Sequence, residues 1–233
     1  MATDDGQVRT LVLWDIDLTL VDYSGVGRRW YEDALSTVVG VPLKHLPSFP
    51  GRTERSLARE FLTAHGVEHS DERVERFFAA LTDLAEQDRP ALPTLGRALV
   101  GAPEILTELS VREGVVQSLV TGNLPVLANY KLAALDLHHH IDFETAGYGS
   151  LSEHRHDLVA AAITQSSAKH GDFDSVVVIG DTPHDVAAGL HHGTTTVGVA
   201  TGRFTATELA ESGAHVTLAD LSDTPAVAAA LLP

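Results

Sequence analysis

The chain contains no cysteine among its 233 residues. Disulfide bonds and cysteine-ligated zinc sites are therefore excluded, which suits a reducing compartment. The opening stretch, MATDDGQVRT, has no basic segment followed by an apolar one, so we see no secretory signal and expect a cytoplasmic protein. No apolar run approaches the roughly 20 residues that a membrane-spanning helix needs.

Basic residues are scarce as well, and lysine is the scarcest of them. The chain has 32 Asp and Glu against 16 Lys and Arg, a formal net charge of −16, and only three of the 16 are lysines. So acidic a surface repels nucleic-acid phosphates and anionic lipids, and we expect neither nucleic acid nor a membrane as a partner. It also repels a phosphorylated metabolite, unless a cation and local hydrogen-bond donors reverse the field at the site. The oligomeric state stays open.

Residues 96–233 alternate between short apolar runs and helical patterns. The runs GVVQSLVTGN, DSVVVIGDTPHD and TTTVGVATG predict buried strands, and IDFETA predicts another short one. HVTLADL predicts a last strand or a loop. Together with the apolar run that precedes Asp15, they predict an α/β fold with a doubly wound parallel sheet, covered by helices on both faces.

Residues 21–95 do not alternate in this way. GRRWYEDALSTVVG, RTERSLAREFLTAHG and DERVERFFAALTDLAEQ predict three amphipathic helices with no strand between them. A helical block between the first strand and the rest of the sheet indicates an inserted helical cap domain. We therefore predict a core of residues 1–20 and 96–233 and a cap of residues 21–95.

Polar residues follow three of the predicted strands, at the point where each strand ends. They are Asp15 and Asp17, then Thr121, Gly122 and Asn123, then Asp181 and Asp185. Because ligands bind outside the carboxyl ends of parallel strands, we expect these residues to meet at one rim. Carboxylates from different strands suit Mg²⁺; one can attack phosphorus, and a second can transfer the proton. Backbone amides around a glycine, with a hydroxyl, can hold phosphate oxygens.

A phosphate site also needs a basic side chain. Between Asn123 and Asp181 the candidates, histidine aside, are Lys131, Arg155 and Lys169. Lys131 falls inside a predicted helix and Lys169 near the end of another. Arg155 lies in a loop just before a helix, and it is the best placed of the three.

With these motifs the chain resembles the haloacid dehalogenase (HAD) superfamily, in its phosphatase branch with a helical cap, which includes phosphoglycolate phosphatase-like proteins. DIDLT matches the first motif of that family, VTGN resembles the second and IGDTPHD the fourth, in the family's order. Three ordered motifs on three strand ends are far more specific than one. The resemblance covers essentially the whole chain and implies a HAD-like Rossmannoid core.

The resemblance also implies roles for individual residues. Asp15 would be the nucleophile and a metal ligand, and Asp17 the general acid/base, with its backbone carbonyl also facing the metal. The remaining roles would be Mg²⁺ binding by Asp181 and Asp185, and phosphate binding by Thr121, Gly122 and Asn123. An acid at position 17 points to phosphoryl transfer, since the dehalogenases of this superfamily need no general acid there.

The chain departs from the family pattern at two positions. Leu18 stands where the family often has glycine. Arg155 stands where the family usually has lysine, often followed by proline. Arginine keeps the positive charge and can hold phosphate with two hydrogen bonds, although the two side chains are not equivalent at a tight site.

Some of these residues have a plainer interpretation. Asp185 could be an acid favoured in the first turn of a helix, and Thr-Gly-Asn is also ordinary turn chemistry. Arg52 could bind an anionic group remote from the transferred phosphate, or it could simply open an amphipathic helix.

The sequence therefore predicts Mg²⁺-dependent hydrolysis of a small phosphomonoester through an aspartyl-phosphate at Asp15, with a small phosphorylated metabolite as the partner. One alternative keeps the chemistry and changes the acceptor, giving a phosphotransferase or phosphomutase. Another is a binding protein that retains the fold without turnover; the arginine at position 155 favours it, and the intact acids oppose it. The sequence does not name the substrate.

Overall fold

Six parallel strands form the main sheet of the computed structural model, which describes residues 8–232. In chain order they are β1 (Thr10–Trp14), β4 (Val115–Thr121), β5 (Gly147–Tyr148), β6 (Ser175–Gly180), β7 (Thr195–Val199) and β8 (Val216–Leu218). The spatial order is β5-β4-β1-β6-β7-β8, so β1 lies between β4 and β6. Trp14, the last residue of β1, pairs with Leu119 and Ile179, and the carboxyl ends of these three strands therefore lie side by side.

Helices cover both faces of this sheet because its strands are apolar on both faces. All five residues of β1 are buried; Leu11 and Leu13 pack on one side, Val12 and Trp14 on the other. The first side is covered by α7 (Arg155–His170) and α8 (Pro183–His191), and the second by α5 (Ala102–Ser110), α6 (Pro125–Ala134) and α10 (Thr224–Leu231). The short helix α9 (Ala206–Glu211) packs near β7 and β8. The predicted doubly wound α/β fold is confirmed; residues 1–7 and 233 of the predicted core lie outside the described part.

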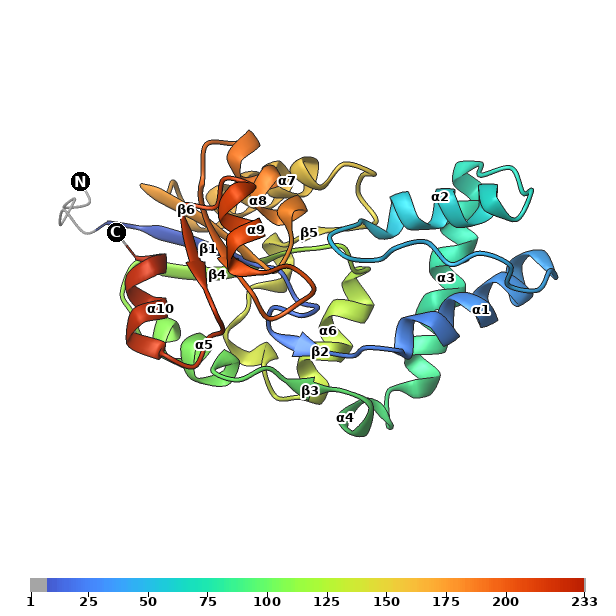
Figure 1. Ribbon diagram of the computed structural model, residues 1–233, viewed down its shortest axis with the longest axis horizontal. Coiled ribbons are helices and arrows are strands. Elements are labelled where there is room, and N and C mark those ends of the chain that lie inside the picture. Colours follow the sequence, from blue (N-terminus) through green and yellow to red (C-terminus); the bar gives the residue numbers. More distant parts are fainter. Residues whose placement is uncertain (1–7, 233) are drawn as a thin grey trace.

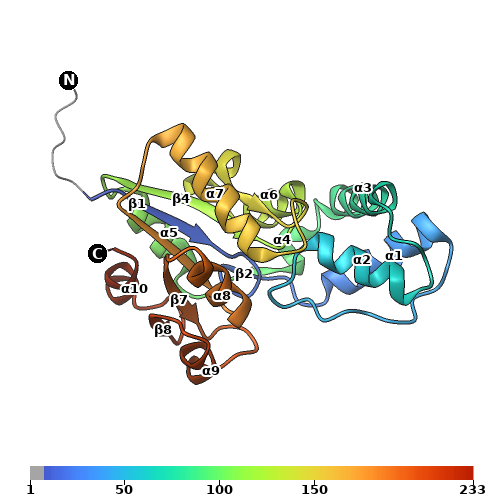
Figure 2. The ribbon, with the colours of Figure 1, turned by 90° about the horizontal axis from the view of Figure 1, so that it is seen from above.

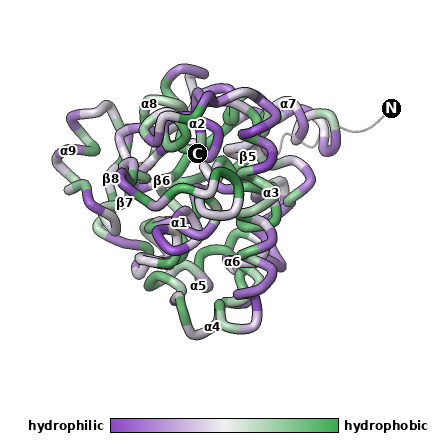
Figure 3. The backbone as a smooth tube through the Cα atoms, turned by 90° about the vertical axis from the view of Figure 1, so that its right-hand side faces the viewer, coloured by the Kyte–Doolittle hydropathy of each residue, from purple (hydrophilic) through white to green (hydrophobic). Residues whose placement is uncertain are grey.

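Three further helices lie beyond the carboxyl ends of the strands, as Figures 1 and 2 show. They are α1 (Val26–Val39), α2 (Glu54–Ala64) and α3 (Asp71–Asp88), followed by the single turn α4 (Leu92–Leu95). Aromatic rings form their interior: Tyr31 packs edge-on against Phe61 and Phe77, with ring centroids 5.3 Å apart in both pairs. Figure 3, which views this end of the molecule, shows hydrophilic and hydrophobic segments alternating along these helices, the pattern of amphipathic packing.

The chain passes to these helices and back through a two-stranded antiparallel pair that the sequence did not predict. It consists of β2 (Val21–Asp22) and β3 (Arg97–Ala98), and an ion pair between Asp22 and Arg97, 2.6 Å long, links the two strands. The pair holds the outgoing and returning segments together where the helical segment joins the sheet.

The prediction of a strand at residues 141–146 is wrong. The segment contains a 3₁₀ turn, Phe143–Thr145, which follows another at His138–His140, and the strand β5 begins only at Gly147. The side chain of Asp142 accepts a hydrogen bond from the backbone N–H of Glu144, which stabilises a turn instead of an extended chain. None of the helices in the described part of the chain combines the length and the hydropathy that crossing a bilayer requires.

Candidate active site

Three buried carboxylates meet at the carboxyl end of the sheet. Asp15 follows β1, Asp181 follows β6, and Asp185 lies in the first turn of α8; one oxygen from each lies within 4.8 Å of the other two. None of the three residues is more than 7 % exposed. Neighbouring carboxylates repel one another, so this cluster needs positive charge nearby.

Asp185 is held in place by a capping box at the start of α8. The Thr182 hydroxyl donates a hydrogen bond of 2.6 Å to Asp185 Oδ2, and the backbone N–H of Thr182 donates one of 3.1 Å to the same oxygen. Its other oxygen, Oδ1, is directed at the cluster and accepts no hydrogen bond within the described residues. The helix-capping interpretation of this residue is therefore confirmed for one oxygen, while the other oxygen faces the site and its role as a metal ligand stays a prediction.

The guanidinium of Arg155 lies between two of these carboxylates. Its Nη2 atom is 2.6 Å from Asp15 Oδ1 and 2.6 Å from Asp185 Oδ1, and it donates a hydrogen bond of 3.0 Å to the carbonyl of Val120. The contact with Asp185 has the distance of an ion pair without the angles of a hydrogen bond, which agrees with the unsatisfied Oδ1 atom. Arg155 is 8 % exposed. The structure thus brings it to the place where a basic residue was expected.

One buried arginine does not neutralise three carboxylates. Burial and repulsion from neighbouring acids outweigh Arg155 and raise the pKa of Asp15, and the same two causes raise the pKa of Asp181. Burial alone would lower the pKa of Arg155, but Asp185 and Asp15 more than compensate and raise it. An all-oxygen cluster with surplus negative charge and an unsatisfied acceptor fits a hard divalent cation, for which carboxylate oxygens are the usual ligands.

Asp17 occupies a different position, facing the open side of the site. Its side chain is 42 % exposed, and its oxygens lie 2.8 and 2.7 Å from the ammonium of Lys131. Asn123 donates a hydrogen bond of 2.7 Å to Asp17 and accepts one of 2.7 Å from Lys131. The carboxylate of Asp17 is therefore not part of the three-carboxylate cluster, and the contact of its backbone carbonyl with a metal stays a prediction.

Sequence reasoning missed Lys131, because it was set aside as a residue inside a helix. It is 8 % exposed and lies on the buried face of α6 with Leu127, Ala128 and Leu132. A lone lysine four residues after a buried leucine on an apolar helix face was the available signal, since burial of an ammonium requires a partner.

The segment Thr121-Gly122-Asn123 lies against the start of α2. The backbone N–H of Glu54 donates a hydrogen bond of 2.9 Å to the carbonyl of Gly122. A Cβ atom at position 122 would be 2.0 Å from the carbonyl oxygen of Arg52, so only glycine permits this approach. The Thr121 hydroxyl is fully buried and accepts a hydrogen bond of 2.8 Å from the Asn123 side chain.

The backbone of the turn after Asp15 would suit glycine at position 18 of this chain, where the family that the chain resembles often has glycine and this chain has leucine. Leu18 has φ 62°, in the left-handed region that favours glycine. Its N–H donates a hydrogen bond of 2.7 Å to the carbonyl of Val21, and its carbonyl accepts one of 2.5 Å from the Thr201 hydroxyl. These two bonds hold a conformation that leucine alone disfavours.

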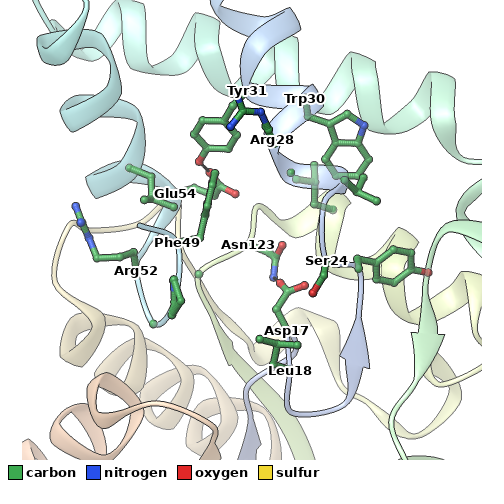
Figure 4. A pocket seen from close by; sticks show the side chains of 18 of the residues that line it. Asp17, Leu18, Ser24, Arg28, Trp30, Tyr31, Phe49, Arg52, Glu54 and Asn123 are labelled. Atoms are coloured by element: carbon green, nitrogen blue, oxygen red, sulfur yellow. Dashed lines mark hydrogen bonds between the residues drawn. The ribbon is translucent and has the colours of Figure 1, made fainter. Parts of the chain in front are cut away.

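A cavity of about 360 Å³ extends from these residues to the helices α1 and α2. Asp17 and Asn123 line its side towards the sheet, and Trp30, Tyr31, Phe49 and Glu54 line the opposite wall (Figure 4). Lys131, which contacts Asp17, also lines the cavity. The Tyr31 hydroxyl donates a hydrogen bond to the Glu54 carboxylate. Burial raises the pKa of Glu54 to about 7. The volume suits a small metabolite.

Arg52 also lines the cavity, but its side chain extends away from Asp17 in Figure 4. Its guanidinium forms an ion pair of 2.9 Å with Glu60 and a hydrogen bond of 3.1 Å with the Ser56 hydroxyl, both on α2. Binding of a remote anionic group by Arg52 therefore stays a prediction.

The comparisons with known proteins agree with the fold. The family profile described as haloacid dehalogenase-like hydrolase matches residues 12–189, a range that contains Asp15, Asp17, Arg155, Asp181 and Asp185. No curated protein matches the chain.

Solved structures resemble the fold over nearly the whole chain. A hydrolase from Pseudomonas syringae superposes with a TM-score of 0.67 at 24% identity, covering 94% of this chain and 97% of that one. A predicted phosphoglycolate phosphatase from Haemophilus somnus 129PT gives 0.68 at 18%, with 94% and 98% covered. A proposed β-phosphoglucomutase from Bacteroides vulgatus gives 0.66 at 19%, with 97% and 91% covered.

Proposed function

Since the chain belongs to the haloacid dehalogenase-like hydrolase family, we propose that it hydrolyses a small phosphomonoester, with Mg²⁺, through an aspartyl-phosphate at Asp15. The observation that carries this proposal is the pairing of two acids with different surroundings. Asp15 is buried with Asp181 and Asp185, whereas Asp17 faces the cavity. Two acids in unlike environments can take the two unlike roles that this chemistry needs.

In this proposal Asp15 attacks phosphorus, and the bond to the leaving oxygen breaks. Arg155, which contacts Asp15 Oδ1, fixes the direction of that carboxylate. Asp17 gives a proton to the leaving oxygen and then takes one from the water that hydrolyses the aspartyl-phosphate. Lys131 and Asn123 hold Asp17 at the cavity wall.

The residues that would hold Mg²⁺ are Asp15, Asp181 and Asp185, with Asp17 contributing its backbone carbonyl. Bound there, the ion would offset the charge of the phosphate and keep the buried carboxylates ionised. Thr121, Gly122 and Asn123 would contact the phosphate oxygens from the other side.

The helical segment acts as a cap in this proposal, with boundaries at residues 21 and 95. Two backbone hydrogen bonds, each 2.9 Å long, tie it to the core: Glu54 N–H to the Gly122 carbonyl and Arg55 N–H to the Gly149 carbonyl. They place an aromatic wall over the reacting groups, where it excludes water.

A second candidate, phosphoryl transfer to a hydroxyl of the substrate, is supported by the likeness to a proposed β-phosphoglucomutase. It shares every residue role up to the aspartyl-phosphate. The two candidates differ only in whether water or a sugar hydroxyl accepts the phosphoryl group from Asp15.

Hydrolysis of p-nitrophenyl phosphate tests the proposal. We expect turnover with Mg²⁺, none with EDTA, and a loss of roughly 10³-fold or more in kcat for Asp15→Asn. Glu72→Gln, which also replaces a carboxylate by an amide, is the matched control, because the Glu72 side chain is exposed in the first turn of α3 and does not line the cavity. Turnover that survives both EDTA and Asp15→Asn would refute the site assignment. Stabilisation by Mg²⁺ without turnover on any phosphomonoester would favour the non-catalytic alternative.

Metal binding should also depend on pH. The raised pKa values of Asp15 and Asp181 mean that a metal ion must displace protons that these groups retain near neutrality. We therefore expect Mg²⁺ to increase the Tm by a few degrees, and by more at about pH 8 than at about pH 6. An equal increase at both pH values, or the same increase in Asp181→Asn, would contradict binding at this cluster.

A further inference from the structure

One acidic side chain in the cavity has no role in the proposed chemistry. Glu54 is the first residue of α2 and is 8 % exposed. It lines the cavity wall opposite Asp17, and Figure 4 shows it beside Tyr31 and Phe49. A carboxylate that is nine-tenths buried in an aromatic wall is costly, so its presence calls for a ligand or a partner.

The protein itself compensates Glu54 only in part. The Tyr31 hydroxyl donates to Oε2, and within the described residues this is the only hydrogen bond that the Glu54 side chain accepts. Lys131 lowers the pKa of Glu54 through space, but burial outweighs it, and no basic side chain in the described range forms an ion pair with Glu54. One carboxylate oxygen is therefore free to accept a hydrogen bond from a ligand.

The backbone fixes Glu54 relative to the phosphate site. Its N–H is bonded to the Gly122 carbonyl at 2.9 Å, next to the residues expected to hold phosphate. Gly149 packs so closely that a Cβ atom there would be 2.8 Å from Glu54 N and 1.7 Å from the Gly122 carbonyl oxygen. The carboxylate is thus held at a set position, on a wall that the leaving group of a bound substrate would face.

The neighbouring groups on this wall offer little other polarity. The indole N–H of Trp30 is already donated to Asp88, at 2.6 Å. Phe49 and Leu57 are apolar. Arg28 also lines the cavity, but it is exposed, and water and salt screen its charge. Glu54 is therefore the buried polar group on this wall that can discriminate between leaving groups.

We propose that Glu54 is a specificity-determining residue, which selects phosphomonoesters whose leaving group carries a hydrogen-bond donor, hydroxyl or ammonium, at the end away from the phosphate. When Glu54 is ionised, as at about pH 8, a donor there pairs with its free oxygen, whereas an alkyl end leaves that oxygen unpaired and a carboxylate end repels it. The inference rests on the function proposed above, because it assumes that the substrate's phosphate binds at Asp15.

Three alkyl phosphates of one length test the proposal: 3-hydroxypropyl, 3-aminopropyl and n-butyl phosphate. For the unaltered protein we expect kcat/KM to be about 10-fold or more higher for a donor-bearing ester than for n-butyl phosphate. Glu54→Leu should reduce both ratios to about one. Glu54→Gln should keep a preference for the hydroxyl ester and lose any preference for the ammonium ester, which separates the two donors.

The ratio of kcat/KM between substrates is the decisive readout, because a merely structural defect would lower all three values together. Glu72→Gln is the matched control, since Glu72 is exposed in the first turn of α3 and should leave the ratios unchanged. Calorimetric titration with the three corresponding alkylphosphonates measures the same selectivity as a ratio of Kd values, and this measurement does not require turnover.

The outcomes separate this inference from the proposed function. Turnover of all three esters with ratios near one, or ratios that Glu54→Leu leaves unchanged, would overturn the inference alone. Absence of all turnover, together with donor-selective binding of the phosphonates that Glu54→Leu removes, would overturn the proposed hydrolysis and support the role of Glu54. Binding without donor selectivity would overturn the inference whatever the turnover.

Discussion

The negative charge of buried acids is compensated differently at two places in this protein. At the sheet ends, Asp15 and Asp185 share the guanidinium of Arg155, each at 2.6 Å. On the cavity wall at the start of α2, the Glu54 side chain accepts a hydrogen bond, within the described residues, from the neutral hydroxyl of Tyr31 alone. The acids at the sheet ends contact a cation, although one too few, whereas no basic side chain of the described residues forms an ion pair with Glu54, which Lys131 affects only through space.

The difference reflects what each set has to bind. A group that must act on every substrate has to be oriented before the substrate arrives, and Arg155 and the capping box at Asp185 provide that orientation. A group that must distinguish substrates gains by staying unpaired until the correct one supplies the missing partner. If both proposals hold, the comparison separates core residues that determine the chemistry from wall residues that determine selectivity.

Removal of Arg155 should have the largest effect, because it breaks the compensation of the core. Arg155→Met leaves Asp15 and Asp185 without their shared cation, and we expect the free energy of unfolding in EDTA at about pH 8 to fall by about 3 kcal/mol. Mg²⁺ should restore part of this loss. Arg155→Lys keeps a charge and should lose less. Urea denaturation with and without Mg²⁺ measures both; equal stability of Arg155→Met and the unaltered protein in EDTA would refute the compensation.

Substitution of Lys131 tests whether this lysine positions Asp17 or binds the substrate. Lys131→Met removes the ion pair that holds Asp17, and we expect kcat to fall by about 10²-fold with a much smaller change in KM. Lys169→Met is the matched control, because that lysine also forms ion pairs, with Asp142 and Glu144, but its side chain is exposed and its partners lie outside the site. A rise in KM at constant kcat would instead make Lys131 a substrate-binding residue.

Much of the core could be predicted because its signals are local. An apolar run that ends in Asp15, or in Gly180 and Asp181, encodes both the strand and the residue that its carboxyl end presents. Parallel pairing then brings such ends together whatever their separation in the sequence. Arg155 was expected in the site on a different ground, as the best placed of the three basic residues, histidine aside, between Asn123 and Asp181 and at the position where the resembled family usually has lysine.

The positions of Glu54 and Lys131 at the cavity could not be predicted in this way. Glu54 begins an amphipathic helix, which fits the ordinary preference for acids in a first turn, and nothing in the local pattern shows that α2 docks on Gly122. Lys131 was missed because its long side chain extends from the last turn of α6 to Asp17, a residue more than a hundred positions away. Docking of one segment on another depends on tertiary packing, which no short pattern encodes.

The smallest expected effect is the contribution of Glu54 to the pH dependence of the free energy of unfolding. Burial raises the pKa of Glu54 from 4.5 to about 7, so over that interval the folded protein keeps a proton that the unfolded chain has lost. The stability that this proton confers is complete below about pH 4.5 and disappears as the pH rises through about 7. Glu54→Gln has no such proton. Its free energy of unfolding, relative to that of the unaltered protein, should therefore increase by about 2 kcal/mol between about pH 5.5 and about pH 7.5.

Chemical denaturation of both proteins at several pH values, in EDTA so that metal binding does not contribute, measures this difference. The buried acids of the core titrate equally in both proteins and cancel in the comparison. Glu72→Gln, exposed on α3, should show no such trend. If the free energy of unfolding of Glu54→Gln did not increase relative to that of the unaltered protein as the pH rose, the Glu54 carboxylate would already have a partner in the folded state. The difference between the acids at the sheet ends, which contact Arg155, and Glu54, which forms no ion pair with the described residues, would then be lost.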